Sequence, residues 1–375
     1  MRRLKVMSVF GTRPEAIKMC PIVKKLEECE YIESIVCLTG QHREMLRQVT
    51  DIFKIRADYD LDIMKPDQTL TTITTGVLQE IEPILDKIRP DIVLVHGDTT
   101  TSFVAALAAF YKKIPVGHVE AGLRTYDKYN PFPEEMNRSL TARIAELHFA
   151  PTVNNRDNLI KENVPGKIFV TGNTVIDAFH TTVKDQYRFD NEQLEKLELQ
   201  GKRVILMTAH RRENLGEPLE NICHAVAEIS SEYSDVEIIY PIHMNPAVKN
   251  TAEKILGGRE RIHLLPPLNV EDMHNLMARS YLVLTDSGGL QEEAPACGVP
   301  VLVLRTETER PEAVEAGTVK VVGVCKDDIV HQTRNLLDDK KEYEAMAKAV
   351  NPYGDGHASE RIISNLLEWG RGVLQ

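Results

Sequence analysis

Paired cysteines are missing from this sequence. A disulfide framework or a zinc site needs cysteines in close and regular spacing, such as a C-x-x-C pair. The chain has no such pair, which argues against both and fits a reducing cytoplasm. The six cysteines are scattered in apolar contexts at Cys20, Cys29, Cys37, Cys223, Cys297 and Cys325.

Long apolar runs and an excess of positive charge are missing as well. The N-terminal stretch MRRLKVMSVFG breaks at Gly11 and Arg13, too early for a signal peptide or a bilayer span. We therefore expect a cytoplasmic protein with no membrane partner. Lys and Arg total 45 against 56 Asp and Glu, and the net charge of -11 repels phosphodiester backbones. General nucleic-acid binding is thereby excluded, and any bound phosphate needs a local site.

The order of apolar runs predicts an α/β protein with two Rossmann-like, doubly wound domains. Short β-branched runs precede amphipathic stretches at residues 4–10, 34–39, 92–96 and 116–119, which is the order of βαβ units. After a polar stretch at 184–200 the pattern restarts. The second series of expected strands is 204–208, 237–240, 262–265, 282–285 and 301–304. A chain of 375 residues is also long enough for two cores.

Turn residues and a breaker cluster set the expected boundaries. Residues 1–172 form the first domain, 173–357 the second, and 358–375 a helix that returns to the first. Ligands of open α/β sheets bind outside the carboxyl ends of the strands. We therefore expect an active-site cleft between the two domains.

The first expected strand runs into a turn suited to an anion. The turn reads G-T-R-P-E-A-I-K, in which Gly11 permits tight geometry and Pro14 suits a first helical turn. Arg13 and Lys18 add positive charge where a phosphate can rest. Neither G-x-G-x-x-G nor a Walker lysine is present, and an ordinary capped turn is the alternative.

Carboxylates follow two further strands. The segments H-G-D and H-V-E end in Asp98 and Glu120, and P-E-E adds Glu134. Alternation along a strand lets His96 share a face with Asp98, and His118 with Glu120. Together they predict an acidic cluster for proton transfer. There are two alternatives. In one, Asp98 is only the N-cap of a helix. In the other, the cluster binds a metal through His96, Asp98, His118 and Glu120.

Two junctions of the second half carry phosphate-binding features. His210 follows a strand in a cationic turn, either as a functional group or as a capping histidine. The turn S-G-G at residues 287–289 lets backbone amides and a helix dipole approach a diphosphate. Glu293 is one helical turn further on, and Arg310 in a charged loop is a second phosphate contact or part of a solvated loop.

A resemblance to a known family spans nearly the whole chain. It rests on the collinear segments FGTRPEAIK, HGDTTT, GHVEAGLRT, PFPEEMNR, TAHRRENLG, PIHMNP, LTDSGGLQEEAP, TERPEAVEAGT and NPYGDG. Together these resemble the bacterial non-hydrolysing UDP-N-acetylglucosamine 2-epimerases. The resemblance implies a GT-B-like fold, a homodimer, and no metal or cofactor.

The resemblance also implies residue roles. The catalytic residues would be Asp98, Glu120, Glu134 and His210. The residues that hold the sugar, the phosphates and UDP would be Arg13, Lys18, Met273, Ser287, Gly288, Gly289, Glu293 and Arg310, with Met273 packing on uracil. The implied reaction eliminates UDP to give 2-acetamidoglucal and adds it back after protonation of the other face, for surface-polysaccharide or teichoic-acid precursors.

Many members of this family are activated by UDP-N-acetylglucosamine at a second site. The matching residues here are Gln41, Gln68, Glu134, Arg211 and His243. This chain has Glu44 and Asp67 where relatives have neutral or basic residues, so we expect weaker or altered activation. Open alternatives for the whole chain are a hydrolysing epimerase, a retaining GT-B glycosyltransferase, a UDP-sugar sensor and a metallohydrolase.

Overall fold

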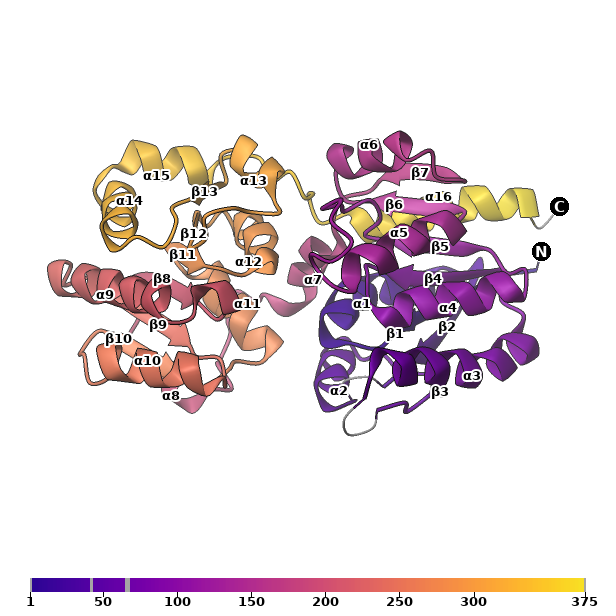
Figure 1. Ribbon diagram of the computed structural model, residues 1–375, viewed down its shortest axis with the longest axis horizontal. Coiled ribbons are helices and arrows are strands. Elements are labelled where there is room, and N and C mark those ends of the chain that lie inside the picture. The colour runs from indigo at the N-terminus through magenta and orange to yellow at the C-terminus, as the bar shows by residue number, and fades with distance from the viewer. Residues whose placement is uncertain (1, 41–42, 65–67, 374–375) are drawn as a thin grey trace. The chain divides into compact units, whose positions relative to one another are not determined.

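The chain folds into two compact units. A computed structural model describes residues 2–40, 43–64 and 68–373. The first unit consists of Met1–Thr181 and Tyr353–Gln375, and the second of Thr182–Pro352 (Figure 1). Within the described residues, no helix combines the length and apolarity that a membrane crossing requires.

The first unit is built on a seven-stranded parallel sheet of order β3-β2-β1-β4-β5-β6-β7. The interior strand β1 pairs with β2 on one side and β4 on the other, so the winding of the chain reverses there. The strands are β1 (Leu4–Phe10), β2 (Ile32–Leu38), β3 (Tyr59–Asp60), β4 (Ile92–His96), β5 (Val116–Val119), β6 (Leu147–Ala150) and β7 (Lys167–Val170). Strands β4, β5 and β6 are buried along their whole length, as expected of a parallel sheet covered on both faces.

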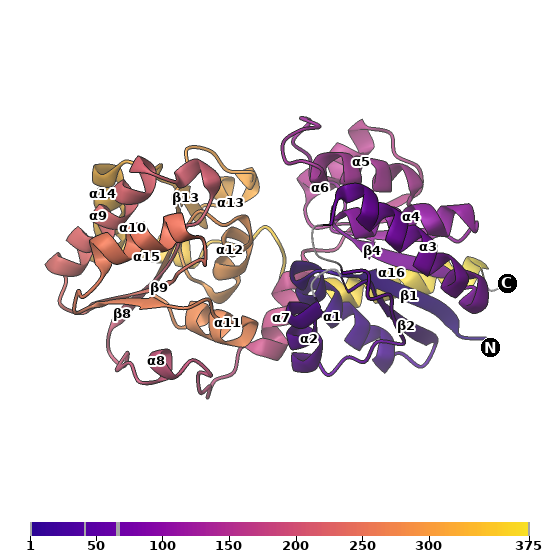
Figure 2. The ribbon, with the colours of Figure 1, turned by 60° about the horizontal axis from the view of Figure 1, so that its bottom comes forward.

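Helices cover both faces of this sheet. Helices α3, α4 and α5 pack in series on one face, and α1 packs with α16 on the other (Figure 2). The helices are α1 (Arg13–Glu28), α2 (Arg43–Ile52), α3 (Leu70–Ile88), α4 (Thr100–Tyr111), α5 (Glu134–Ile144), α6 (Val153–Lys161), α7 (Thr174–Thr182) and α16 (Ala358–Val373).

The second unit repeats the same winding. Its parallel sheet has the order β10-β9-β8-β11-β12-β13, with the reversal between β8 and β11. The strands are β8 (Arg203–Thr208), β9 (Val236–Pro241), β10 (Ile262–Leu265), β11 (Leu282–Thr285), β12 (Val301–Val303) and β13 (Val319–Val321). The helices are α8 (Glu192–Glu195), η1 (Arg212–Asn214), α9 (Glu217–Glu232), α10 (Pro246–Leu256), α11 (Val270–Ala278), α12 (Gly288–Glu293), η2 (Ala294–Cys297), α13 (Pro311–Glu315), α14 (Lys326–Asp338) and α15 (Lys340–Ala347).

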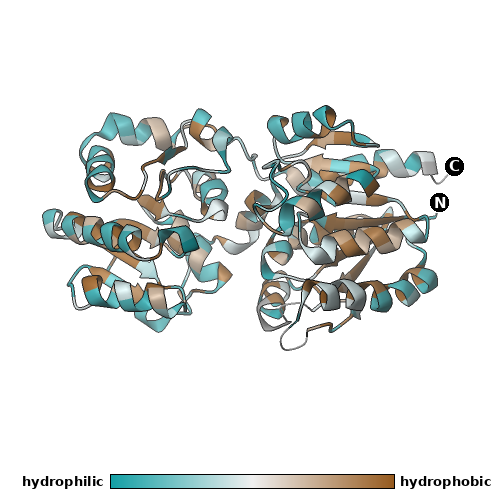
Figure 3. Cartoon of the chain, in the orientation of Figure 1, coloured by the Kyte–Doolittle hydropathy of each residue, from teal (hydrophilic) through white to brown (hydrophobic). Residues whose placement is uncertain are grey.

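This architecture confirms the predicted α/β class with two doubly wound, GT-B-like units. Apolar residues concentrate on the strands and on one side of each covering helix, while polar residues occupy the opposite side (Figure 3). Burial of those faces is the main stabilising contribution to each unit.

The units divide after Thr181 rather than after residue 172. Helix α7 stays with the first unit because it is hydrogen-bonded to the returning chain. The amide of Asn173 donates to the carbonyl of Tyr353 at 2.6 Å. The carboxylate of Asp177 accepts the amides of Ala358 and Ser359 at 3.2 and 2.7 Å, which caps the start of α16.

Candidate active site

Glu15 joins two strand-to-helix turns of the first unit, the turn after β1 and the turn after β4. Its buried carboxylate accepts the amides of Gly11 at 3.0 Å and Thr12 at 2.7 Å. It also accepts the hydroxyls of Thr99 at 2.7 Å and Ser102 at 2.8 Å. The turn after β1 is thus a capped turn, as the alternative held, and it is fixed to the turn that carries Asp98.

Glu120 is a buried carboxylate in a cationic pocket. Lys18 forms an ion pair with it, Asn173 donates to it at 3.1 Å, and His96 Nε2 lies 3.6 Å away. Burial alone would raise the pKa of Glu120, but the charges of Lys18 and His96 hold that pKa well below its usual range. Glu120 has a φ of 59°, in the left-handed region, so it lies past the end of β5.

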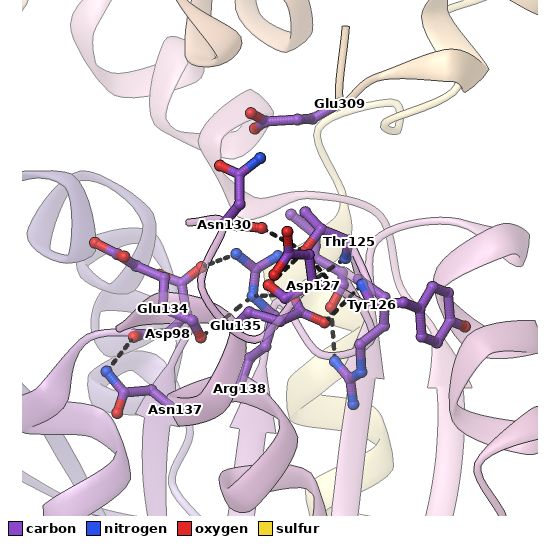
Figure 4. Close-up of polar contacts among 12 residues, drawn as sticks. Asp98, Thr125, Tyr126, Asp127, Asn130, Glu134, Glu135, Asn137, Arg138 and Glu309 are labelled. Carbon is purple, nitrogen blue, oxygen red and sulfur yellow. Dashed lines mark hydrogen bonds and ion pairs between the residues drawn. The ribbon is translucent and has the colours of Figure 1, made fainter. Parts of the chain in front are cut away.

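The pKa of Asp98 is shifted in the opposite direction from that of Glu120. Burial raises the pKa of its carboxyl; Arg138 opposes the shift, and Glu120 and Glu134 add to it. Arg138 Nη2 lies 3.1 Å from the carboxylate (Figure 4), whose side chain keeps 32% of its surface exposed. The N-cap of α4 is Thr99, so the N-cap alternative for Asp98 is wrong.

Glu134 and Glu135 begin helix α5 and have different surroundings. A carboxylate oxygen of Glu134 is buried with no hydrogen-bond partner among the described residues. Glu135 instead accepts the amides of Thr125 and Tyr126, each at 3.1 Å, and pairs with Arg138 at 3.4 Å (Figure 4). Glu135 therefore holds the preceding loop, while Glu134 retains acceptor capacity for a ligand.

His118 is a structural residue. It is fully buried, and its Nε2 bonds the carbonyl of Gly97 at 2.7 Å. Burial lowers the pKa of His118 to about 3, so the ring is neutral. The prediction that His118 and Glu120 share a face assumed that both lie on one strand, but β5 ends before Glu120. Across residues 2–40, 43–64 and 68–373, no three His, Cys, Asp or Glu side chains gather in a metal-binding group.

Asp286 organises the corresponding turns of the second unit. It is fully buried, and one oxygen accepts the amides of His210 at 2.7 Å and Arg211 at 2.8 Å and the side chain of Asn214 at 3.0 Å. Its other oxygen lies 3.3 Å from His210 Nδ1. Burial lowers the pKa of His210, an effect that Asp286 opposes without cancelling.

Two guanidinium groups approach the S-G-G turn. A β-carbon built on Gly288 would lie 3.8 Å from Nη2 of Arg310 and 3.9 Å from Nη2 of Arg211. Glu292 pairs with the Nε of Arg310 and orients it. Ser287 heads α12 without a side-chain capping bond. Amide donors and two planar cations at one turn suit a diphosphate.

The remaining predicted residues lie around these two groups. Arg13 is the first residue of α1, next to the capped turn. Met273 is half-buried on α11, and Glu293 lies against Gly289 on α12. His243 stacks on His210 with ring centroids 5.3 Å apart. Gln68 donates to the carbonyl of Ile63 in its own loop, and Gln41 falls outside the described residues.

Several residues that organise these turns were not among the predicted site residues. They are Glu15, Glu135, Arg138, Asn173 and Asp286, each of which bonds a turn or loop other than its own, while Glu15 also caps its own turn. Asp286 lies directly before the S-G-G turn, and Glu15 three residues after Thr12 matches a capping box, so both carried a local signal. The partners of Asn173 and Arg138 depend on tertiary folding.

The two parallel sheets, with charged side chains gathered at their strand ends, define an α/β protein of the doubly wound, Rossmann-like class. Residues 24–367 match the family model described as UDP-N-acetylglucosamine 2-epimerase. The UDP-N-acetylglucosamine 2-epimerase of Bacillus subtilis is 56% identical in sequence to this chain, over 98% of this chain and 96% of the Bacillus subtilis protein.

Solved structures agree with this match. A Staphylococcus aureus protein in complex with UDP is 50% identical, with a TM-score of 0.89 over 98% of this chain and 97% of that one. A Neisseria meningitidis UDP-GlcNAc 2-epimerase bound to UDP-GlcNAc is 48% identical, with a TM-score of 0.86 over 97% and 100%. The chain belongs to the UDP-N-acetylglucosamine 2-epimerase family, a family of isomerases.

Proposed function

We propose that this protein interconverts UDP-N-acetylglucosamine and UDP-N-acetylmannosamine by inverting carbon 2 of the sugar, without releasing the free sugar. The observation that carries the proposal is the contrast between two neighbouring carboxyls. Asp98 has a raised pKa and Glu120 a lowered one, both at the carboxyl end of one sheet. Titratable groups whose environments push their pKa values apart are typical of acid and base pairs.

The chemistry of carbon 2 requires such a pair. Carbon 2 is not next to a carbonyl group, so the direct removal of its proton by a base is very slow. In the proposed route the bond from carbon 1 to the diphosphate oxygen breaks and UDP leaves with the electron pair. A carboxylate takes the proton from carbon 2, and a double bond forms between carbons 1 and 2. UDP then adds back to carbon 1 as carbon 2 is protonated on its other face.

Asp98 and Glu120 are the proposed proton-handling pair. Asp98 gains a proton more readily than an ordinary aspartate, which suits a group that both takes and returns one. Glu120 is ionised beside Lys18, so it begins the reaction as the member of the pair that can accept a proton, and its negative charge stabilises the positive charge that develops at carbon 1. Glu134, with its buried acceptor oxygen, is the third carboxyl near the sugar.

The second unit is proposed to hold UDP. The amides of the turn from Ser287 to Gly289 and the guanidinium group of Arg310 would bind the diphosphate. A Staphylococcus aureus protein of similar sequence has been solved in complex with UDP. Glu293 would accept the ribose hydroxyls, Met273 would pack on uracil, and His210 would contact the departing diphosphate. Arg13 and Lys18 would supply positive charge from the first unit. In this proposal the bound substrate is closed off from solvent during the reaction, so that the intermediate is retained.

A second molecule of UDP-N-acetylglucosamine is proposed as an activator. Arg211 and His243 lie beside His210, so the proposed activator would reach the diphosphate turn directly. Gln41, Gln68 and Glu134 complete the proposed set, and Glu44 and Asp67 are expected to weaken it. Rates that are hyperbolic in substrate and insensitive to Arg211→Ala would exclude this site.

We further propose a cytoplasmic homodimer that supplies precursors of surface polysaccharide or teichoic acid. The proposed dimer predicts twice the monomer mass in light scattering.

Product analysis by nuclear magnetic resonance tests the activity. Incubation with UDP-N-acetylglucosamine alone should give UDP-N-acetylmannosamine at equilibrium, and the same mixture from the opposite direction. Stoichiometric free N-acetylmannosamine and UDP would instead identify a hydrolysing epimerase. Turnover that requires an added acceptor would identify a glycosyltransferase, and binding without turnover would identify a sensor.

A further inference from the structure

A buried histidine lies behind the carboxylate proposed to bind the ribose. His274 on α11 is 3% exposed, and its Nε2 lies 3.8 Å from a carboxylate oxygen of Glu293 on α12. The other oxygen of Glu293 would lie 3.1 Å from a β-carbon on Gly289. The carboxylate is therefore confined between the imidazole and the turn that precedes it.

The other side of the imidazole is fixed by Thr182. The hydroxyl of Thr182, itself fully buried, lies 2.8 Å from Nδ1 of His274. When this hydroxyl donates to Nδ1, the neutral ring carries its proton on Nε2, the atom that faces Glu293. The neighbouring Asn275 donates to the carbonyl of Thr182 at 2.7 Å and holds that residue in place.

Thr182 also has a special place in the chain. It is the first residue of the second unit, and Pro352 is the last. Next to Pro352, the side chain of Asn351 donates to the carbonyl of Glu292 on α12 at 3.1 Å. One of the points where the chain passes between the units is thus hydrogen-bonded to α11, which carries His274, and the other to α12, which carries Glu293.

We propose that His274 is a positioning residue for the nucleotide: held by Thr182, it fixes the Glu293 carboxylate where that group accepts the ribose hydroxyls. The inference rests on the proposed function, since it needs Glu293 to bind ribose. It assigns to His274 no contact with the substrate. It also links ribose binding to the residue at which the chain enters the second unit.

The test compares UDP with 2′,3′-dideoxy-UDP, which lacks the ribose hydroxyls, by titration calorimetry. His274→Leu should weaken UDP binding about tenfold, because it removes the polar group that faces the Glu293 carboxylate, and leave dideoxy-UDP within about twofold of the parent protein. His274→Gln, whose amide can still donate toward Glu293, should restore UDP binding to within about threefold.

The chain offers a matched control and a milder variant. His263 pairs with Glu237 at 2.8 Å on strands of the same unit, so His263→Leu removes a similar pair and should leave both affinities unchanged. Thr182→Val keeps the shape of the side chain but removes the hydroxyl, and should weaken UDP alone by about threefold. It carries the test if His274→Leu does not fold.

The outcomes separate the inference from the function it rests on. Equal weakening of UDP and dideoxy-UDP, or no weakening of UDP, overturns the role of His274. Parent protein that binds UDP no better than dideoxy-UDP overturns ribose recognition by Glu293. Parent protein that binds neither nucleotide overturns the proposed function itself.

Discussion

Replacing Lys18 by Met should destabilise the protein through Glu120. Lys18 and Glu120 form a largely buried ion pair, with 15% and 11% of their side-chain surfaces exposed. Breaking such a pair by removing one partner costs about 3–5 kcal/mol. Because His96 and Asn173 continue to contact the carboxylate, we expect a loss of about 3 kcal/mol in the free energy of unfolding at pH 7, the low end of this range.

The cost should depend on pH in a defined direction. The pKa of Glu120 is lower in the folded protein than its ordinary value of 4.5, so its ionisation stabilises the fold above that pH. This stabilisation is lost as the pH falls through the folded-state pKa. The difference between the parent protein and Lys18→Met should therefore be full at pH 7 and shrink below about pH 4.5.

Urea unfolding of four proteins measures the effect. They are the parent protein, Lys18→Met, Glu120→Gln and the double variant, compared at neutral and acidic pH. With a neutral residue at 120, the cost of losing Lys18 should fall to about a quarter of its value, because no charge is left unpaired. An equal cost in both backgrounds, unchanged by pH, would refute the electrostatic argument.

Three further predictions concern single residues. Arg138→Gln removes a charge that lowers the pKa of Asp98, so the acidic limb of the profile of kcat/KM against pH should move to higher pH. Arg143→Gln on the same helix is the control. An acidic limb that Arg138→Gln does not move would contradict the role of Asp98. Asp286→Asn should cost about 2 kcal/mol in urea unfolding and lower the pKa of His210 further, as followed by its ring proton resonances; an unchanged titration would show that the two are not coupled. Gly122→Ala places a β-carbon 2.2 Å from the carbonyl oxygen of Asn155 at a φ of 96°, so it should cost at least about 2 kcal/mol, whereas Gly372→Ala meets no atom within 4 Å and should change stability little.

The sequence predicted the strands that dominate the two sheets because buried parallel strands leave uninterrupted apolar runs. The expected strands at 262–265 and 282–285 match β10 and β11 residue for residue. Strand β3, with two residues, and β13, with three, left no comparable signal, since strands this short are stabilised by pairing with a neighbour.

The candidate site was predictable in its charges but not in their arrangement. Asp98 and Glu120 were placed at strand ends from turn chemistry. Their opposite pKa shifts depend on tertiary structure: burial raises the pKa of Asp98, whereas Lys18, which is distant in the sequence, lowers that of Glu120, so no local pattern could reveal them. The boundary after Thr181 likewise depends on Asp177 capping α16 from far along the chain.

Isotope incorporation at carbon 2 tests the proposed chemistry most directly. UDP-N-acetylglucosamine incubated with the protein in deuterated water should gain deuterium at carbon 2 of both epimers, and Asp98→Asn should reduce the rate of gain by two orders of magnitude or so. Epimers that form at the normal rate while retaining the original hydrogen at carbon 2 would contradict proton removal by a carboxylate, and with it the proposed reaction.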